Sequence, residues 1–157
     1  MVQKKRNVFV TGASRGIGKG IANWFIENGY YVAFGFKESV EYLQNPMSLP
    51  NLITLQVDIE DRVSIKKAIQ EAQSHFDGSI DILVNNAAIA QEKEFENITD
   101  ADWDKMLAVN LRGAFSFSQE VIPPMKKKKW GRIVNISSVG GQVGGLNQVH
   151  YAASKAA

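Results

Sequence analysis

Two side chains near the end of the sequence, Tyr151 and Lys155, have the types and spacing of a proton-transfer pair. Residues four apart lie on one face of a helix, and the run 150–157 has a helical composition. A free tyrosine has a pKa of about 10 and is therefore a reluctant acid near neutral pH. A nearby ammonium group favours the phenolate and brings the tyrosine pKa closer to the working pH. The pair is a candidate for acid catalysis; the alternative is two ordinary neighbours on a helix face.

Ser138 and Asn110 are further candidates for chemistry. Ser138 follows a predicted strand over residues 131–137, where its hydroxyl could donate a hydrogen bond to a substrate carbonyl and stabilise the charge that develops there. The alternative for Ser138 is a simple turn at the end of a strand. Asn110 is expected near the buried face of a helix, where its amide needs hydrogen-bond partners.

The segment Thr11–Gly18 contains three glycines and has the features of a phosphate-binding turn. It follows the apolar run 7–10 and precedes residues 19–28, in which apolar side chains recur at helical spacing, so it connects a strand to a helix. In such a turn Gly12 can adopt a backbone conformation closed to other residues, and Gly18 lets the helix pack closely against the strand.

Gly16 leaves the backbone of this turn open, so that N–H groups at the helix N-terminus can bind an anion, above all the pyrophosphate of a dinucleotide. The glycine spacing is G-x-x-x-G-x-G rather than the G-x-G-x-x-G of the usual fingerprint, so a tight turn without a ligand is the alternative. The expected cofactor contacts in the turn are Gly12, Ser14, Arg15, Gly16, Ile17 and Gly18.

The residue after the second predicted strand, 30–36, indicates which dinucleotide would bind. Such sites usually place an acidic residue here, which binds the adenosine ribose. This sequence has Lys37 instead, and no carboxylate precedes Glu38 in this region. A cation at Lys37, together with Arg15, suits a 2′-phosphate, so we expect NADP(H) rather than NAD(H). The alternative is that both are ordinary surface charges.

Polar residues also end the next two predicted strands, 53–57 and 81–88. Asp58 could bond the edge of an adenine, cap the helix that begins near Asp61, or do both. Asn85 and Asn86 lie at the C-terminal end of a continuous apolar strand, where open α/β sheets bind ligands. The alternative role of their amides is to tie neighbouring strand ends together.

Strands and helices alternate along the chain, which predicts a single α/β domain, residues 1–157, with a doubly wound parallel sheet in the order 3-2-1-4-5. Before the fifth strand we expect one helix that starts at a capping box of Thr99 and Asp102 and is closed by Pro123–Pro124 and the lysine run that follows. The buried face of this helix is expected to carry Trp103, Leu107, Leu111, Ala114 and Phe115.

Two connections are expected to be irregular. The crossover 39–52 is interrupted by Pro46 and Pro50, so it predicts a weak or broken helix. The glycine-rich segment Gly140–Gly145 predicts a loop. His75, at the polar end of the helix after Asp61, is expected to be a surface residue.

Composition narrows the range of functions. The chain has 157 residues, of which 45% are hydrophobic, and a net charge of +2. Its basic clusters, Lys4–Arg6 and Lys126–Lys129, are not interleaved with aromatic residues, so we expect solvated loops rather than nucleic-acid binding. The absence of cysteine excludes disulfides and thiolate chemistry, and we expect no metal site. The N-terminal apolar run is too short for a signal peptide or a membrane span, which predicts a soluble, cytoplasmic protein.

In their order and separation, the motifs resemble the short-chain dehydrogenase/reductase family over essentially the whole chain. The motifs are Thr11–Gly18, Asn85-Asn86-Ala87, Asn110, Ser138 and Tyr151-x-x-x-Lys155. The glycine turn, the strand before Ser138 and the thirteen-residue step from Ser138 to Tyr151 are most similar to bacterial 3-oxoacyl-[acyl-carrier-protein] reductases and related acetoacetyl-CoA reductases.

The resemblance implies a role for each motif residue. Tyr151 would protonate the ketone oxygen, Lys155 would hold the nicotinamide ribose and lower the tyrosine pKa, and Ser138 would orient the carbonyl. Asn110 would hold a water in a proton relay. The cofactor would contact Asn86, Ala87, Lys37, Asp58, Tyr151 and Lys155. NADPH would reduce a 3-oxoacyl thioester to the 3-hydroxyacyl product; the alternatives are a family member acting on a sugar, steroid or small alcohol, and a cofactor-binding module without catalysis.

The chain departs from the family pattern in three places. Ala88 stands where the family usually has glycine, and the crossover 37–52 is short and contains two prolines. The family's chain usually continues for roughly ninety further residues. These supply most of the catalytic helix, two strands and a segment that closes over the substrate. We therefore expect weak cofactor binding and little turnover from these residues, and a homodimer or homotetramer for a full-length chain.

Overall fold

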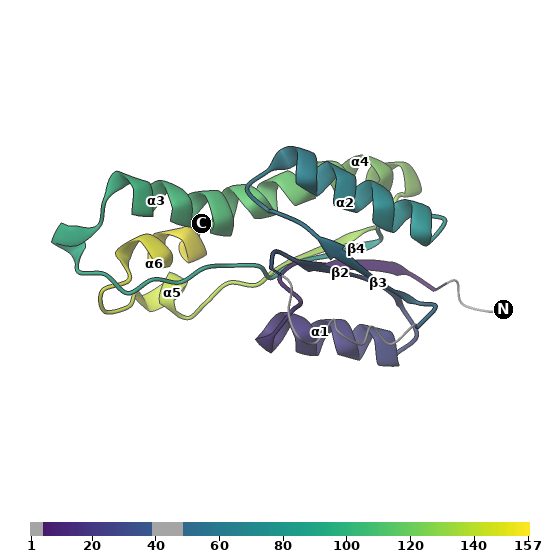
Figure 1. The fold of residues 1–157 in the computed structure, drawn as a ribbon, viewed down its shortest axis with the longest axis horizontal. Coiled ribbons are helices and arrows are strands. Elements are labelled where there is room, and N and C mark those ends of the chain that lie inside the picture. Colours follow the sequence, from purple (N-terminus) through teal and green to yellow (C-terminus); the bar gives the residue numbers. More distant parts are fainter. Residues whose placement is uncertain (1–4, 39–48) are drawn as a thin grey trace.

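A computed structural model of the chain describes residues 5–38 and 49–157. Within them, five parallel strands form one sheet; helix α1 (Gly16–Glu27) covers one face, and α2 (Arg62–His75) and α4 (Gly113–Lys128) cover the other (Figure 1). The strand order, β3-β2-β1-β4-β5, confirms the predicted doubly wound α/β fold.

The strands are close to their predicted positions. They are β1 (Asn7–Val10), β2 (Tyr31–Phe36), β3 (Leu52–Gln56), β4 (Ile82–Asn85) and β5 (Arg132–Asn135). β1 is buried along its whole length between β2 and β4, as its β-branched apolar run predicts. β4 ends earlier than predicted, because the small residues after Asn85 leave the sheet to meet the glycine turn. Most of the crossover 39–52 lies outside the described residues.

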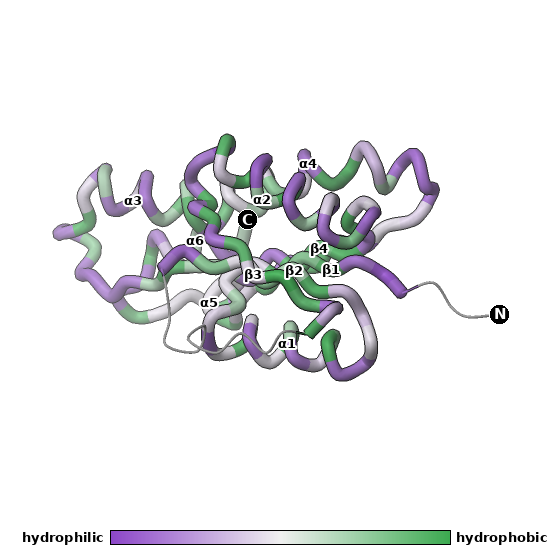
Figure 2. Tube along the Cα trace, turned by 45° about the vertical axis from the view of Figure 1, so that its right-hand side comes forward, coloured by the Kyte–Doolittle hydropathy of each residue, from purple (hydrophilic) through white to green (hydrophobic). Residues whose placement is uncertain are grey.

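Alternate residues of β1 face the two helical layers. Phe9 packs with Ile65 of α2 and with Phe117 of α4, its ring centroid lying 5.2 Å from that of Phe117. Val8 and Val10 face the opposite side and pack with Ala22 of α1. Figure 2 shows the strands as a hydrophobic centre between helices of mixed character. Because the strands are parallel, all their C-terminal ends lie at one edge of the sheet, where the functional residues gather.

Helix α3 (Asp100–Leu107) continues through a π-helical turn, Ala108–Arg112, directly into α4. The predicted capping box is confirmed: Thr99 Oγ1 accepts from Asp102 N at 3.2 Å, and Asp102 Oδ2 accepts from Thr99 N at 2.9 Å. The predicted end at Pro123–Pro124 is wrong, since both prolines lie inside α4. The prolines have no N–H group and therefore remove the helical hydrogen bonds to the carbonyls of Gln119 and Glu120.

The prediction that the lysine run closes the helix is confirmed, whereas the expectation of a loop at Lys126–Lys129 is wrong for all but the last of these residues. Lys126, Lys127 and Lys128 occupy the last turn with exposed side chains, and Lys129 ends the helix with a left-handed φ of 54°. Cations are favourable at this end of a helix because the last carbonyl groups carry partial negative charge.

The predicted buried face of the long helix is mostly wrong. Trp103 and Leu111 are each 39% exposed and Phe115 is 54% exposed. The large buried side chains are instead Met106, Val109, Phe117, Val121 and Met125. The π-helical turn adds a residue to one turn of the helix and so rotates the following residues relative to a regular 3.6-residue pattern.

The C-terminal part contains two helices. The segment predicted as a loop, Gly140–Gly145, contains a short helix, α5 (Gly140–Val143), whose start is fixed by the hydrogen bond from Gly140 N to Ser138 Oγ at 3.1 Å. The predicted helix around Tyr151 is confirmed as α6 (Val149–Ala156). His75 is exposed, as predicted. Among the described helices, none has the length and apolar character needed to cross a bilayer.

Candidate active site

A cleft of about 890 Å³ runs along the C-terminal ends of β1, β2 and β4, and we call it the cofactor cleft. Nearly all the predicted cofactor residues outside α6 line it: Gly12, Ser14, Arg15, Gly16, Ile17, Gly18, Lys37, Asn86 and Ala87. The other lining residues are Phe36, Glu38, Val57, Ile59, Glu60, Ala88, Ile89, Lys105 and Val109. Lys105 and Val109 were not predicted from the sequence. Their spacing of four residues places them on one helix face, but the spacing does not show what that face contacts.

The glycine turn has the shape that a phosphate site requires. Gly12 has a φ of +63°, and a Cβ there would lie 2.7 Å from Ala87 Cα. A Cβ on Gly18 would lie 2.3 Å from Asn86 Nδ2, so α1 can approach β4 only through a glycine. A Cβ on Gly16, whose φ is +54°, would meet no atom of the described residues within 4 Å. The backbone at Gly16 is therefore open to the cleft, and a dinucleotide pyrophosphate fits this turn.

Asn86 and Thr11 hold the strand ends around the turn. Asn86 Nδ2 donates to the carbonyls of Thr11 and Gly12, both at 3.0 Å. Thr11 Oγ1 accepts from the backbone N–H groups of Asn86 and Ala87, again at 3.0 Å. Asn85 Nδ2 donates to Asn135 Oδ1 at 2.9 Å and so joins β4 to β5. Both asparagines therefore tie strand ends together, and Asn86 also lines the cleft.

Charged residues gather at the end of the cleft where β2 ends, which is the end predicted to bind the adenosine. Lys37 Nζ lies 3.0 Å from Asp58 Oδ2 and 3.1 Å from Glu60 Oε2. Hydrogen bonds to Asp58 and Glu60 raise the pKa of Lys37. The backbone N–H of Glu60 and the ammonium of Lys37 lower the pKa of Asp58. Asp58 does not cap α2, because Asp61 accepts from Val63 N and Ser64 N instead.

Ser138 and Tyr151 meet at Gly140. A Cβ on Gly140 would lie 3.5 Å from Ser138 Oγ and 3.7 Å from Tyr151 Cε1, so the hydroxyl and the phenol ring flank the same glycine. Ser138 Oγ accepts a hydrogen bond from Gly140 N, which leaves its proton for a further acceptor. The two predicted catalytic groups are therefore brought together by the turn from β5 into α5.

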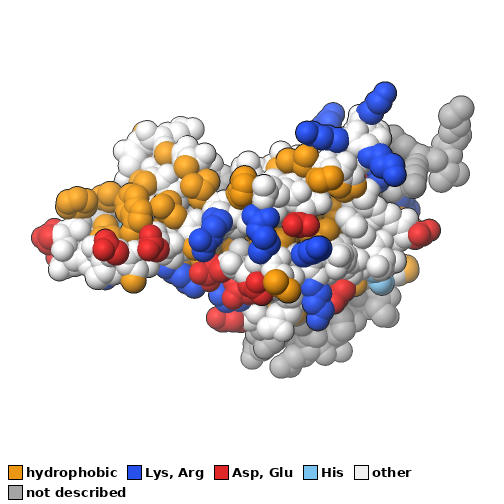
Figure 3. Space-filling model, turned by 90° about the horizontal axis from the view of Figure 1, so that it is seen from above, with side chains coloured by type: hydrophobic (Ala, Val, Ile, Leu, Met, Phe, Trp, Pro, Cys, Tyr) orange, Lys and Arg blue, Asp and Glu red, His pale blue; other side chains and the backbone are white. Residues whose placement is uncertain are grey.

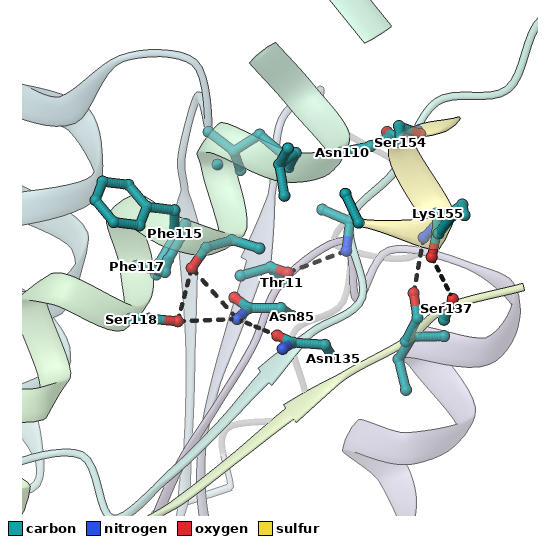
Figure 4. A pocket seen from close by; sticks show the side chains of 18 residues that line it. Thr11, Asn85, Asn110, Phe115, Phe117, Ser118, Asn135, Ser137, Ser154 and Lys155 are labelled. Carbon is teal, nitrogen blue, oxygen red and sulfur yellow. Dashed lines mark hydrogen bonds between the residues drawn. The ribbon is translucent and has the colours of Figure 1, made fainter. Parts of the chain in front are cut away.

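Lys155 lies on α6, four residues after Tyr151. Its Nζ donates to the carbonyl of Ile136 at 2.7 Å, and burial lowers its pKa. Its carbonyl accepts from Ser137 Oγ at 2.6 Å. Lys155 lines a second cavity of about 410 Å³, together with Asn85, Asn110 and Asn135 (Figure 4). Neither Tyr151 nor Lys155 is among the described residues that line the cofactor cleft, although Ala87 and Ile59 border both spaces.

Asn110 joins the two halves of the site. It lies in the π-helical turn, and its Oδ1 accepts from Ile89 N while its Nδ2 donates to Ile89 O, each at 2.9 Å. The same Nδ2 donates to Ser154 Oγ at 2.9 Å. The predicted need for partners is met by the rim of the cofactor cleft on one side and by α6 on the other.

Comparison with known proteins agrees with this geometry. Residues 6–157 match the short chain dehydrogenase family. The chain is 38% identical to the 3-oxoacyl-[acyl-carrier-protein] reductase FabG of Staphylococcus aureus, covering 96% of this chain and 63% of that protein. The corresponding Thermotoga maritima reductase is 39% identical over 94% of this chain and 61% of its own length. Nodulation protein G of a Rhizobium species is 39% identical, with 96% and 62% covered.

The chain thus spans less than two thirds of the length of each of these relatives. The aligned part contains the glycine turn, the strand-end asparagines and the Ser138–Tyr151–Lys155 set, which occupy the positions described above. Because the family model matches residues 6–157 and the strand order is that of a doubly wound α/β fold, the chain belongs to the short-chain dehydrogenase family.

Proposed function

We propose that this chain is the cofactor-binding and catalytic part of an NADP(H)-dependent oxidoreductase that reduces a 3-oxoacyl thioester to a 3-hydroxyacyl thioester. The observation that carries the proposal is the convergence of Ser138 Oγ and the Tyr151 ring on Gly140, in the same domain as an open glycine turn. The described elements share one sheet, which supports a single domain over residues 1–157.

In this reaction three side chains, Ser138, Tyr151 and Lys155, would have distinct roles. When bound in the cofactor cleft, NADPH supplies a hydride for the carbonyl carbon. Ser138 donates a hydrogen bond to the carbonyl oxygen and stabilises the charge that builds up on it. Tyr151 gives its phenolic proton to that oxygen, which completes the alcohol. Lys155, one helical turn from Tyr151, carries an ammonium that favours the phenolate left behind.

Two basic residues support the preference for NADP(H). Arg15 and Lys37 both line the cofactor cleft, and a basic residue in this region accommodates the adenosine 2′-phosphate in related sites. Titration of the chain with NADPH and NADH tests the preference. We expect tighter binding of NADPH, and equal or tighter binding of NADH contradicts this part of the proposal.

The names of the relatives support the substrate class, because two of them are reductases of 3-oxoacyl groups on acyl carrier protein. The test measures reduction of acetoacetyl-CoA and of a 3-oxoacyl group on acyl carrier protein. The reaction is monitored by the loss of absorbance of the reduced nicotinamide. In a full-length chain we expect Tyr151→Phe to lose on the order of a hundredfold or more of the rate, since it removes the proton donor. Unchanged reduction by Tyr151→Phe contradicts the mechanism.

One observation favours a second function, a nucleotide-binding domain without turnover. Lys155 Nζ is bound to the Ile136 carbonyl, and Lys155 is outside the cofactor cleft. In that case NADPH raises the melting temperature and changes tryptophan fluorescence, while neither ketone is reduced. The same titration and assay separate the two functions.

We also propose that the protein self-associates. Exposed apolar side chains gather at the α3 end of the molecule and along the start of α4 (Figure 3). They include Trp103, Leu111 and Phe115, each at least 39% exposed. Light scattering on a full-length chain tests this: Phe115→Glu is expected to shift an oligomer toward the monomer, and a wild-type monomer at all concentrations contradicts the proposal.

A further inference from the structure

Glu60 accepts hydrogen bonds from two lysines that come from different elements. Lys37 follows β2 and reaches Glu60 Oε2 at 3.1 Å. Lys105 extends from α3 and donates to the same oxygen. All three residues line the cofactor cleft at its adenosine end. A single carboxylate oxygen therefore stands between two ammonium groups in the region where a 2′-phosphate would be bound.

The two lysines have different principal partners. The hydrogen bond from Lys105 is the largest cause that lowers the pKa of Glu60, ahead of the one from Lys37. For Lys37, the hydrogen bond to Asp58 is the largest cause of its raised pKa, and the bond to Glu60 comes second. Glu60 is thus held more strongly by Lys105 than by Lys37, and Lys37 lies between Asp58 at 3.0 Å and Glu60 at 3.1 Å.

The balance of charge depends on Lys105. Lys37 and Lys105 together offset Asp58 and Glu60, and Arg15 adds a positive charge to the same cleft. Without Lys105, two carboxylates would face Lys37 alone. A phosphate that approached Lys37 would then compete with the Glu60 carboxylate for the Lys37 ammonium. The carboxylate would also repel the phosphate, because both groups are negatively charged.

We propose that Lys105 contributes to dinucleotide specificity by offsetting the charge of Glu60, so that this carboxylate repels an adenosine 2′-phosphate less and competes less with it for the Lys37 ammonium. The inference rests on the proposed NADP(H) function and assigns to α3 a residue that acts on the cofactor through another side chain. Lys105 is therefore a positioning residue, and its effect requires the carboxylate of Glu60.

The test measures binding rather than activity. The probes are adenosine 2′,5′-bisphosphate, which carries the 2′-phosphate, and adenosine 5′-monophosphate, which lacks it. Their dissociation constants are measured by calorimetry for the wild-type chain, Lys105→Met, Glu60→Gln and the double variant. Lys67→Met is the matched control, since Lys67 forms an exposed ion pair with Glu71 on α2, away from the cleft.

Lys105→Met is expected to weaken binding of the bisphosphate about tenfold and of the monophosphate by less than about twofold, because only the former has a phosphate beside Lys37. Glu60→Gln is expected to strengthen bisphosphate binding. In the Glu60→Gln background, Lys105→Met should have almost no effect. The control should match the wild type, and the differences should shrink as salt is added.

Two results overturn the inference. An equal loss from Lys105→Met with and without Glu60 means that Lys105 contacts the phosphate directly. No change from Lys105→Met in the ratio of the two dissociation constants means that it has no part in specificity. A wild-type chain that binds both probes equally contradicts the proposed NADP(H) preference, whereas the role of Lys105 is still decided by the double-variant cycle.

Discussion

Asn110 Nδ2 donates a hydrogen bond to Ser154 Oγ at 2.9 Å, and this bond links the π-helical turn to the helix that carries Tyr151. Asn110 also makes two hydrogen bonds to the backbone of Ile89, at the rim of the cofactor cleft. One side chain thus connects three segments that are far apart in the sequence. Its loss should affect the stability of the fold as well as any reaction at the site.

Asn110→Ala is expected to lower the free energy of unfolding by about 2 kcal/mol, because it removes two hydrogen bonds to the Ile89 backbone and one to the hydroxyl of the buried Ser154. Ser154→Ala is the smaller change, with an expected loss of about 1 kcal/mol. Urea denaturation of both variants measures the difference. An equal effect of the two substitutions contradicts a central role for Asn110.

Gly18→Ala should be far more damaging than Gly20→Ala, although both lie in α1. A Cβ at Gly18 would collide with Asn86 Nδ2 and Gly12 O, whereas one at Gly20 would meet no atom of the described residues within 4 Å. We expect Gly18→Ala to cost about 1–3 kcal/mol and to weaken nucleotide binding. Gly20→Ala should stabilise the helix by up to about 1 kcal/mol. Thermal melts with and without NADPH distinguish the two variants.

Thr11→Val tests the acceptor that holds the two strand ends. Thr11 is buried, and its hydroxyl accepts from the N–H groups of Asn86 and Ala87. Valine has a similar shape but leaves both N–H groups unsatisfied, so we expect a loss of about 2–4 kcal/mol. Thr11→Ser keeps the acceptor and should lose less than half as much. Chemical denaturation would contradict this account if serine and valine behaved alike.

Asp102 should make stability depend on pH in the acid range. Hydrogen bonds from Lys93 and then from Thr99 hold the pKa of Asp102 well below its ordinary value of 3.8. A depressed pKa adds stability that is complete above the ordinary value and is lost as the pH falls below it. The advantage of the wild type over Asp102→Asn should therefore be constant near neutrality and shrink below about pH 4. Denaturation curves across this range measure it, and a constant difference contradicts the assignment.

Local requirements explain which parts of the fold could be predicted from the sequence. The run at β1 and the glycines at 12 and 18 have only a few compatible conformations, so strand, turn and helix followed from the residues themselves. The capping box of Thr99 and Asp102 is also a contact within four residues. The strand order followed because parallel strands joined by helices have few allowed connections.

The features that could not be predicted depend on contacts between distant segments. The π-helical turn changes which residues of α3 and α4 are buried, and no local sequence pattern predicts this turn. Glu60 and Lys105 are 45 residues apart and meet only because α3 approaches the connection between β3 and α2. The site residues Asn110, Ser138 and Tyr151 were recognisable by type and spacing, but the partner of Lys155 Nζ, a strand-end carbonyl, depends on how α6 packs.

The close approach of Gly12 to Ala87 restricts what evolution can place at position 87. A Cβ on Gly12 would already be 2.7 Å from Ala87 Cα, and Ala87 separates the cofactor cleft from the second cavity. A larger residue at this position would press on the glycine turn from one side and fill one of the two spaces on the other. Only the methyl group of Ala87 stands between the two spaces at this position. In a library randomised at position 87, only the smallest side chains should survive selection for nucleotide binding.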